Sequence, residues 1–273
     1  MTTHAEFVTP AQFMTAGGPA PVNGNSPWAS RYSHELRRVV AEHAAAAPRQ
    51  LQTQLGPSGM GVLCHRQVVG TMAGLPAINQ VSDPWPSIVG TAVHAWLAEA
   101  FTADNVRHDL RRWIAEQRVT PHPDHPGTAD LYDAVEQAVV DHKVLGETSL
   151  AKLRSPDGPP RRYVVQLLLY GLGYRRLGLP VKRVVLAAYP RTGSRLDGIY
   201  VWDHPWTSAD NQLLDEVFDQ TRQRRVMADL VTAGRLDINQ VPRTPGEDCF
   251  FCPLYSPRAR EGDPGCPGTT TTT

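Results

Sequence analysis

The segment EQAVVDHKV, residues 136–144, is a short apolar run that closes on an Asp-x-Lys triplet. Its β-branched residues, and a length too short for a typical helix, predict a β-strand. Because side chains two residues apart on a strand point to the same face, we expect Asp141 and Lys143 side by side and His142 turned away. A carboxylate beside an ammonium is either an ordinary ion pair or half of a metal-dependent phosphodiesterase site, and the triplet alone does not separate the two.

A second predicted strand lies just upstream, in the run GTADLY that starts at Gly127 and carries Asp130. Few residues separate the two runs, which favours an antiparallel hairpin with Asp133 near its turn. The Asp-x-Lys triplet therefore has another acid on a neighbouring strand.

Helical patterns lie on both sides of this hairpin. The first takes Ser87 as its N-cap and places His94 on or beside its apolar face, where a histidine packed in a core or interface is the commoner interpretation. The second covers residues 163–177, and on it Gln166 and Tyr170 are four residues apart and share a face. They are either site residues or ordinary caps on a stripe of core residues.

The rest of the chain predicts a surface helix over residues 30–49, a short helix near 60–68 that presents Cys64, a β-branched run over 181–190, a hairpin near 196–202, and a long helix over 208–233. Ser208 is the predicted N-cap of the long helix. Near its end stand three arginines that we expect on a solvated face or against phosphates: Arg222, Arg224 and Arg225. Residues 1–26 are predicted to form a flexible arm and 269–273 a disordered tail around one domain, 27–268.

Composition sets limits on the partners. The 273 residues hold 27 Lys plus Arg and 27 Asp plus Glu, so no global basic field attracts nucleic acid, and any DNA binding relies on local patches. The start of the chain lacks the pattern of a signal peptide, and no apolar run is long enough to span a bilayer. We expect a soluble cytoplasmic protein without a membrane partner.

Cysteine is used four times, once early as Cys64 and three times late as Cys249, Cys252 and Cys266. A disulfide framework is not expected in so long an intracellular chain. The Cys-x-x-Cys pair lets two thiolates reach one metal centre, and the remaining two cysteines would complete a set of four ligands. Iron–sulfur and zinc centres both use thiolates, and plain buried thiols are the third alternative.

The order of these features resembles the RecB-like branch of the PD-(D/E)XK nuclease superfamily: Gly-x-x-x-His at 90–94, then Asp130, then Asp141-x-Lys143, then Gln166-x-x-x-Tyr170. With the cysteines, the resemblance runs from Cys64 to Cys266 and is to the iron–sulfur CRISPR-associated exonucleases and their phage-encoded relatives. It implies an α/β, restriction-endonuclease-like core, in which helices flank a mixed central β-sheet. An iron–sulfur lobe would join residues of about 55–80 and 240–268.

The same resemblance implies a metal site and an activity. His94, Asp130, Asp141 and the carbonyl of His142 would bind Mg²⁺ or Mn²⁺, and imidazole favours Mn²⁺. Lys143 would orient or deprotonate the attacking water, and Gln166 and Tyr170 would contact the site and the DNA backbone. The four cysteines would hold a [4Fe-4S] cluster as a structural clamp.

The function implied is a metal-dependent DNA exonuclease that prefers single-stranded ends and acts in recombination, repair or replication, either as one chain or as a homo-oligomer. A catalytically silent DNA-binding module with the same fold and a zinc-stabilised interaction protein are the alternatives. The presence of His94, Asp130, Asp141 and Lys143 together argues against the silent module.

Overall fold

The computed structural model describes residues 26–46, 55–79, 83–260, 262–263 and 265–268. Apart from Ser26, the expected arm and tail lie outside the described residues. The chain divides into two compact units, residues 1–51 and 52–273. The first contains helix α2 (Pro27–Ala45), whose N-terminus is capped where the Ser26 side chain accepts a hydrogen bond from the Ala29 N–H. No α2 residue is buried, which confirms the predicted surface helix, although it begins three residues earlier than expected.

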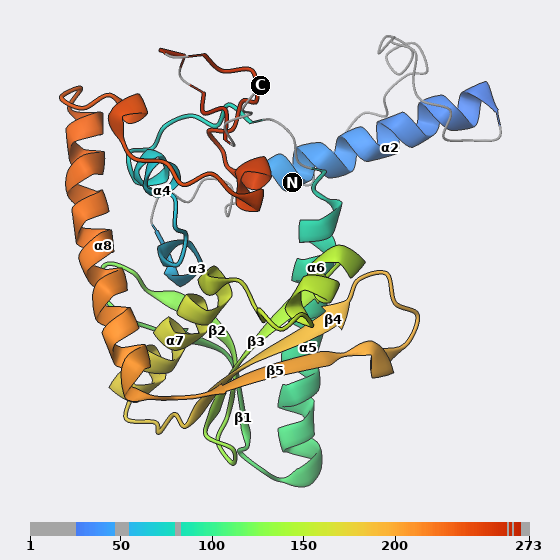
Figure 1. The fold of residues 1–273 in the computed structure, drawn as a ribbon. Coiled ribbons are helices and arrows are strands. Elements are labelled where there is room, and N and C mark those ends of the chain that lie inside the picture. The colour runs from blue at the N-terminus through green and yellow to red at the C-terminus, as the bar shows by residue number, and fades with distance from the viewer. Residues whose placement is uncertain (1–25, 47–54, 80–82, 261, 264, 269–273) are drawn as a thin grey trace, which may run out of the picture. The chain divides into compact units, whose positions relative to one another are not determined.

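A five-stranded mixed sheet forms the centre of the second unit (Figure 1). Its strands stand in chain order: β1 (Trp113–Val119), β2 (Gly127–Asp133), β3 (Ala138–Leu145), β4 (Arg183–Pro190) and β5 (Tyr200–Pro205). Only the β3–β4 pair is parallel. The predicted antiparallel hairpin is β2–β3, in which Leu131 pairs with Val140. Strand β1 was not predicted, because Glu116, Gln117 and Arg118 follow one another and hide the alternation of apolar and polar residues.

Helices cover both faces of the sheet. The parallel β3–β4 pair needs a crossover, which contains α6 (Glu147–Leu153) and α7 (Arg161–Arg176). On one face, Tyr174 of α7 stacks on Tyr132 of β2 with ring centroids 4.7 Å apart. On the other, Phe101 of α5 (Trp85–His108) stacks on His142 of β3 at 5.6 Å. The expected α/β architecture, a mixed sheet flanked by helices, is therefore present.

Two predicted helix starts were displaced. Helix α5 begins at Trp85, before Ser87, and its first turn is held by Asp83, whose Oδ1 accepts the Trp85 N–H at 3.0 Å. Helix α8 (Ser208–Thr232) is capped by Thr207, one residue before Ser208, in a reciprocal capping box with Asp210. In both cases the displaced serine lies inside the first helical turn, because the side chain of an earlier residue, Asp83 or Thr207, accepts a backbone N–H of that turn.

Segments from the two ends of the second unit lie against each other. The early segment contains α3 (Pro57–Met60) and α4 (His65–Met72), and α4 packs on α8. The late segment contains the short 3₁₀ turns η3 (Ile238–Gln240) and η4 (Glu247–Phe251). The Arg66 N–H donates to the Pro242 carbonyl at 2.9 Å and the Ile78 N–H to the Pro253 carbonyl at 2.8 Å. A third turn, η2 (Leu196–Gly198), lies between β4 and β5. Among the described helices, none is both long and apolar enough to cross a membrane.

Candidate functional site

Asp141 and Lys143 form an ion pair on β3 that lies largely out of solvent. The side chain of Asp141 is 2% exposed and that of Lys143 17%. Apart from this ion pair, the buried carboxylate oxygens of Asp141 accept no hydrogen bond from the described residues. Burial, aided by the nearby Asp130, raises the pKa of Asp141 to about 6, against the opposing effect of Lys143. The structure thus confirms the predicted adjacency, and Asp141 is a buried carboxylate with spare acceptor capacity.

The Lys143 ammonium continues into a chain of hydrogen bonds on α7. Its Nζ donates to Gln166 Oε1 at 3.3 Å, and Gln166 Nε2 donates to the Tyr170 hydroxyl at 3.1 Å. Burial alone would lower the pKa of Lys143, but the Asp141 carboxylate raises it above its ordinary value. Lys143 therefore stays charged in this arrangement. A charged ammonium suits orienting a water and donating hydrogen bonds better than accepting a proton. Burial also raises the pKa of Tyr170, so its hydroxyl keeps its proton.

Asp130 connects the hairpin to α5. One carboxylate oxygen, Oδ1, lies 3.4 Å from His94 Nδ1, and the other, Oδ2, accepts the backbone N–H of His142 at 2.7 Å. The hydrogen bond with Asp130 raises the pKa of His94. Burial alone would raise the pKa of Asp130, but His94 and Lys143 hold it below its ordinary value. The β2–β3 pairing ends at Leu131 and Val140, and Asp130 and Asp141 lie next to this last pair on the two strands.

Glu116 is a member of this site that sequence reasoning missed. Three possible ligand atoms lie within 4.8 Å of one another, one each from His94, Glu116 and Asp130. Such a group is able to hold a metal ion. Glu116 stands on β1 between Ala115 and Gln117, which pair with the residues on either side of Asp130. Its φ of 51° is in the left-handed region, where a side chain other than glycine is strained. Only the β1–β2 register reveals this neighbour, and β1 had no clear sequence signal.

The His142 side chain points to the opposite face of the sheet, as predicted. Its ring stacks on Phe101 and meets the Tyr189 ring edge-on at 5.5 Å. Burial lowers its pKa to about 4, so the imidazole is neutral and acts as a packing group. Its backbone N–H faces Asp130, and a role for its carbonyl in metal binding stays a prediction.

Gly127, at the start of the GTAD run, is required by close packing. A Cβ at this position would lie 2.8 Å from the Pro57 ring and 3.0 Å from Cε1 of Tyr170. The glycine therefore allows α3 and the Tyr170 ring to approach the strand that carries Asp130.

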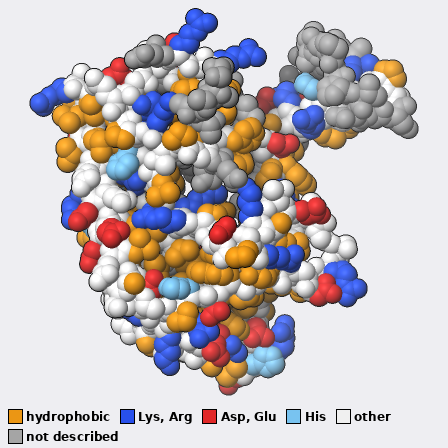
Figure 2. Space-filling model, in the orientation of Figure 1, with side chains coloured by type: hydrophobic (Ala, Val, Ile, Leu, Met, Phe, Trp, Pro, Cys, Tyr) orange, Lys and Arg blue, Asp and Glu red, His pale blue; other side chains and the backbone are white. Residues whose placement is uncertain are grey.

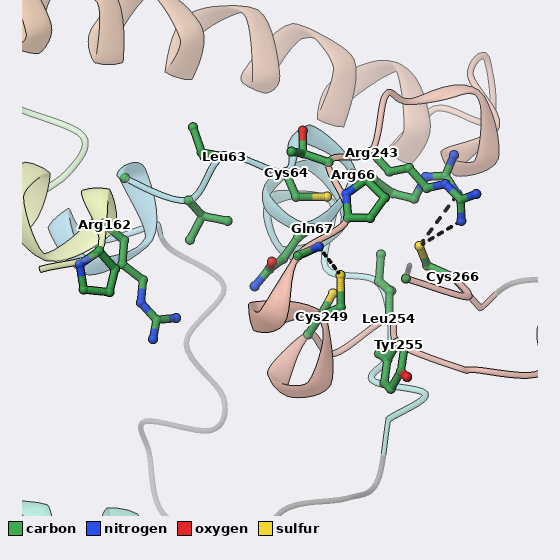
Figure 3. Close-up of a pocket in the computed structure, with 18 of the residues that line it drawn as sticks. Leu63, Cys64, Arg66, Gln67, Arg162, Arg243, Cys249, Leu254, Tyr255 and Cys266 are labelled. Carbon is green, nitrogen blue, oxygen red and sulfur yellow. Dashed lines mark hydrogen bonds between the residues drawn. The ribbon is translucent and has the colours of Figure 1, made fainter. Parts of the chain in front are cut away.

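The four cysteines line one cavity of about 310 Å³ between the early and late segments (Figure 3). Cys64 is the N-cap of α4, Cys249 lies in η4, and Cys252 and Cys266 are buried in the loop that follows. Burial raises the pKa of Cys252 to about 11, and the other three thiols add to this effect. Four arginines also line the cavity: Arg66, Arg161, Arg162 and Arg243. The predicted association of the four cysteines in space is thus present.

Comparisons with known proteins identify no family for this chain. No family model and no curated protein match it. One similar solved structure is a phage-related exonuclease from Haemophilus somnus 129PT, 12% identical with a TM-score of 0.43 over 63% of this chain and 83% of that one. Another is a protein described as SSO0001, 16% identical with a TM-score of 0.42 over 82% of this chain and 93% of that one. Similarity at this level leaves the function to be argued from the site itself.

Proposed function

We propose that this protein is a divalent-metal-dependent deoxyribonuclease whose active site is built on strands β1, β2 and β3. The observation that supports this most is the buried Asp141–Lys143 pair beside the group formed by His94, Glu116 and Asp130. Oxygen donors suit Mg²⁺ or Mn²⁺, and the imidazole favours Mn²⁺. The spare acceptor capacity of Asp141 and the Asp130 carboxylate 3.4 Å from His94 Nδ1 both fit a site that a cation would occupy.

A divalent cation held by these residues would neutralise phosphate charge and lower the pKa of a bound water. The chain supplies the remaining needs of phosphodiester hydrolysis. The Lys143 ammonium, held by Asp141 and Gln166, donates hydrogen bonds to the attacking water or to the phosphate. The Tyr170 hydroxyl fixes the amide of Gln166, so that α7 holds the ammonium in one direction.

Single-stranded DNA is the substrate that the surface fits best. Figure 2 shows Lys and Arg side chains in small separate groups, interspersed with acidic and apolar ones, which suits a narrow path more than a broad contact with duplex DNA. Beside the site, the Tyr163 ring lies 5.1 Å from Lys143 Nζ and 5.0 Å from Arg162 Cζ. An aromatic ring flanked by cations suits stacking on a base, worth about 1–3 kcal/mol.

We further propose a [4Fe-4S] cluster at the four cysteines. A single zinc ion with Zn–S bonds of about 2.3 Å would hold its thiolates only about 3.8 Å apart. Among the described residues, only His94, Glu116 and Asp130 bring three donor atoms within 4.8 Å of one another, so no three of the thiols lie as close as that. A cluster distributes its ligands over several irons, so it fits the wider spacing and the cavity of about 310 Å³. Zinc remains the rival that elemental analysis distinguishes.

The test uses anaerobically purified full-length protein and labelled single-stranded DNA, offered as a linear strand and as a closed circle at equal concentration. With Mn²⁺ we expect degradation of the linear strand and little loss of the circle, and with a chelator no cleavage of either. Equal initial rates on both forms would refute dependence on an end. Absence of Mn²⁺-dependent cleavage would refute the nuclease assignment.

A further inference from the structure

Arg224 is a buried arginine near the middle of the molecule. It is 1% exposed and is the largest fully buried side chain among the described residues. It lies late in α8, in the arginine group that the sequence placed on a solvated face. Arg222 and Arg225 are exposed as expected, so the prediction was wrong for Arg224 alone. Helical spacing explains this, because position 224 lies on the same α8 face as the buried Val217, Thr221 and Ala228.

No carboxylate among the described residues pairs with this buried cation. Arg224 Nη2 donates to the Leu63 carbonyl at 3.2 Å, Nη1 lies 3.5 Å from the Met60 carbonyl, and Nε has no hydrogen-bond partner among the described residues. Burial and the nearby Arg161 lower its pKa, and the Cys64 thiol is the group that opposes them. A buried charge without a counter-charge is strongly destabilising, and an anion close to Arg224 would offset that cost.

The contacts of Arg224 point to the cysteine pocket as the place of that anion. The segment that it holds, from Met60 to Leu63, leads directly into Cys64. On the far side of the pocket, Arg66 and Arg243 each place Nη1 4.0 Å from Cys266 Sγ (Figure 3). The described side chains that line the cavity include no carboxylate. Thiols bordered by guanidinium groups form a site suited to net negative charge.

We propose that Arg224 is the internal counter-charge of an anionic metal–thiolate centre in the cysteine pocket and positions Cys64 through the Met60 and Leu63 carbonyls. This inference rests on the proposed metal centre. A [4Fe-4S]²⁺ core or a Zn²⁺ ion bound by four thiolates leaves two net negative charges. Loading the pocket therefore compensates Arg224, and emptying it leaves a buried cation against two carbonyls. Arg224 thus couples metal occupancy to the packing of α8, in addition to the direct packing of α4 on α8.

The test compares three full-length variants purified anaerobically: Arg224→Gln, which removes the charge, Arg224→Lys, which keeps it, and Arg225→Gln, a matched control one residue away on the exposed face. Iron and zinc content and the rate of metal loss to a chelator are measured. We expect Arg224→Gln to lose metal at least about tenfold faster, equivalent to about 1.4 kcal/mol, while the other two stay close to wild type. Wild-type retention by Arg224→Gln would overturn the inference.

A second measurement needs no variant. Hydrogen exchange of wild-type protein, loaded and stripped of metal, should show faster exchange on stripping both at residues 60–68 and around Arg224 in α8. Faster exchange at residues 60–68 with α8 unchanged would contradict the coupling. Wild-type protein that contains neither iron nor zinc would instead refute the metal centre itself, a result separate from any effect of residue 224.

Discussion

The sheet site and the cysteine pocket gather possible metal ligands in different ways. In the sheet site, Asp130 and Asp141 lie next to the last pair of the β2–β3 ladder. Asp130 accepts the His142 backbone N–H, and Lys143 donates to Gln166 of α7. In the pocket, Cys64 lies at the start of α4, Cys249 in η4, and Cys252 and Cys266 in the loop that follows. Cys64 is therefore far in sequence from the other three. The first site is held by the fold, whereas a metal centre in the second would hold parts of the fold together. Substitutions should therefore separate activity in the sheet site from stability in the pocket.

The largest effect on stability is expected from Cys252→Ser. Cys252 is buried, and a serine hydroxyl is a poor replacement for a thiolate on iron or zinc. The variant should lose its metal and either aggregate or melt at least about 10 °C below wild type. Asp130→Asn should keep the full metal content of the pocket and melt within a few degrees of wild type. Equal melting of Cys252→Ser and wild type would remove the distinction between the two regions.

A smaller loss is expected from Asp133→Asn, at the turn that holds β2 to β3. Asp133 is 4% exposed and accepts hydrogen bonds from Arg112 and from the Val135 and Glu136 N–H groups. Because Arg112 is 35% exposed, the loss of this partly buried pair should lower the free energy of unfolding in urea by about 1–3 kcal/mol. The control Asp203→Asn breaks an exposed pair with Arg183 and should cost under about 1 kcal/mol.

The Asp133 effect should also depend on pH with a fixed sign. Burial alone would raise the pKa of Asp133, but Arg112 and two backbone N–H groups lower it below its ordinary value. The stabilisation is therefore complete above the unfolded pKa of about 3.9 and disappears as pH falls through the lower folded pKa. The stability difference between wild type and Asp133→Asn should shrink below about pH 4. A difference that grows with acid would contradict the ion pair.

A third effect concerns Mn²⁺ binding at the sheet site. The pKa of Asp141 is raised to about 6 by burial, and that of His94 is raised by its hydrogen bond with Asp130. Both groups must be deprotonated to bind a cation, so affinity should fall as pH drops through these pKa values, by roughly tenfold per pH unit for each protonated group and so by about a hundredfold per unit below both pKa values. Titration calorimetry at several pH values measures the Mn²⁺ affinity. Unchanged affinity between about pH 7.5 and 5 would exclude these two ligands.

The smallest effect should come from Glu116→Gln. Glu116 is exposed and stands at the edge of the group with His94 and Asp130, so its charge is better screened than that of the buried acids. We expect Mn²⁺ affinity to fall by roughly three- to tenfold. A loss as large as that of Asp130→Asn would make Glu116 a principal ligand.

The sequence predicted those parts of the site that local patterns specify. The β2–β3 hairpin, the shared face of Asp141 and Lys143, and the helix carrying Gln166 and Tyr170 follow from periodicity and spacing. Glu116 was missed because only the β1–β2 register brings it to Asp130. Burial of Arg224 was missed because an arginine-rich helix end is ordinarily solvated. The spacing of Arg224 from Val217 and Thr221 already set it on the buried face of α8, whereas the position of Glu116 depends on pairing between strands, which local residue patterns do not encode.

The most direct measurement is Mn²⁺-dependent cleavage of end-labelled linear single-stranded DNA by wild type, Asp130→Asn and Asp203→Asn. Asp130→Asn preserves the size of the side chain and an acceptor for the His142 N–H while it removes the charge. Asp203→Asn makes the same chemical change on the exposed strand β5. We predict cleavage by wild type and Asp203→Asn, and a loss on the order of 10³-fold in Asp130→Asn with its fold retained. Equal rates for all three proteins would contradict a nuclease site on these strands.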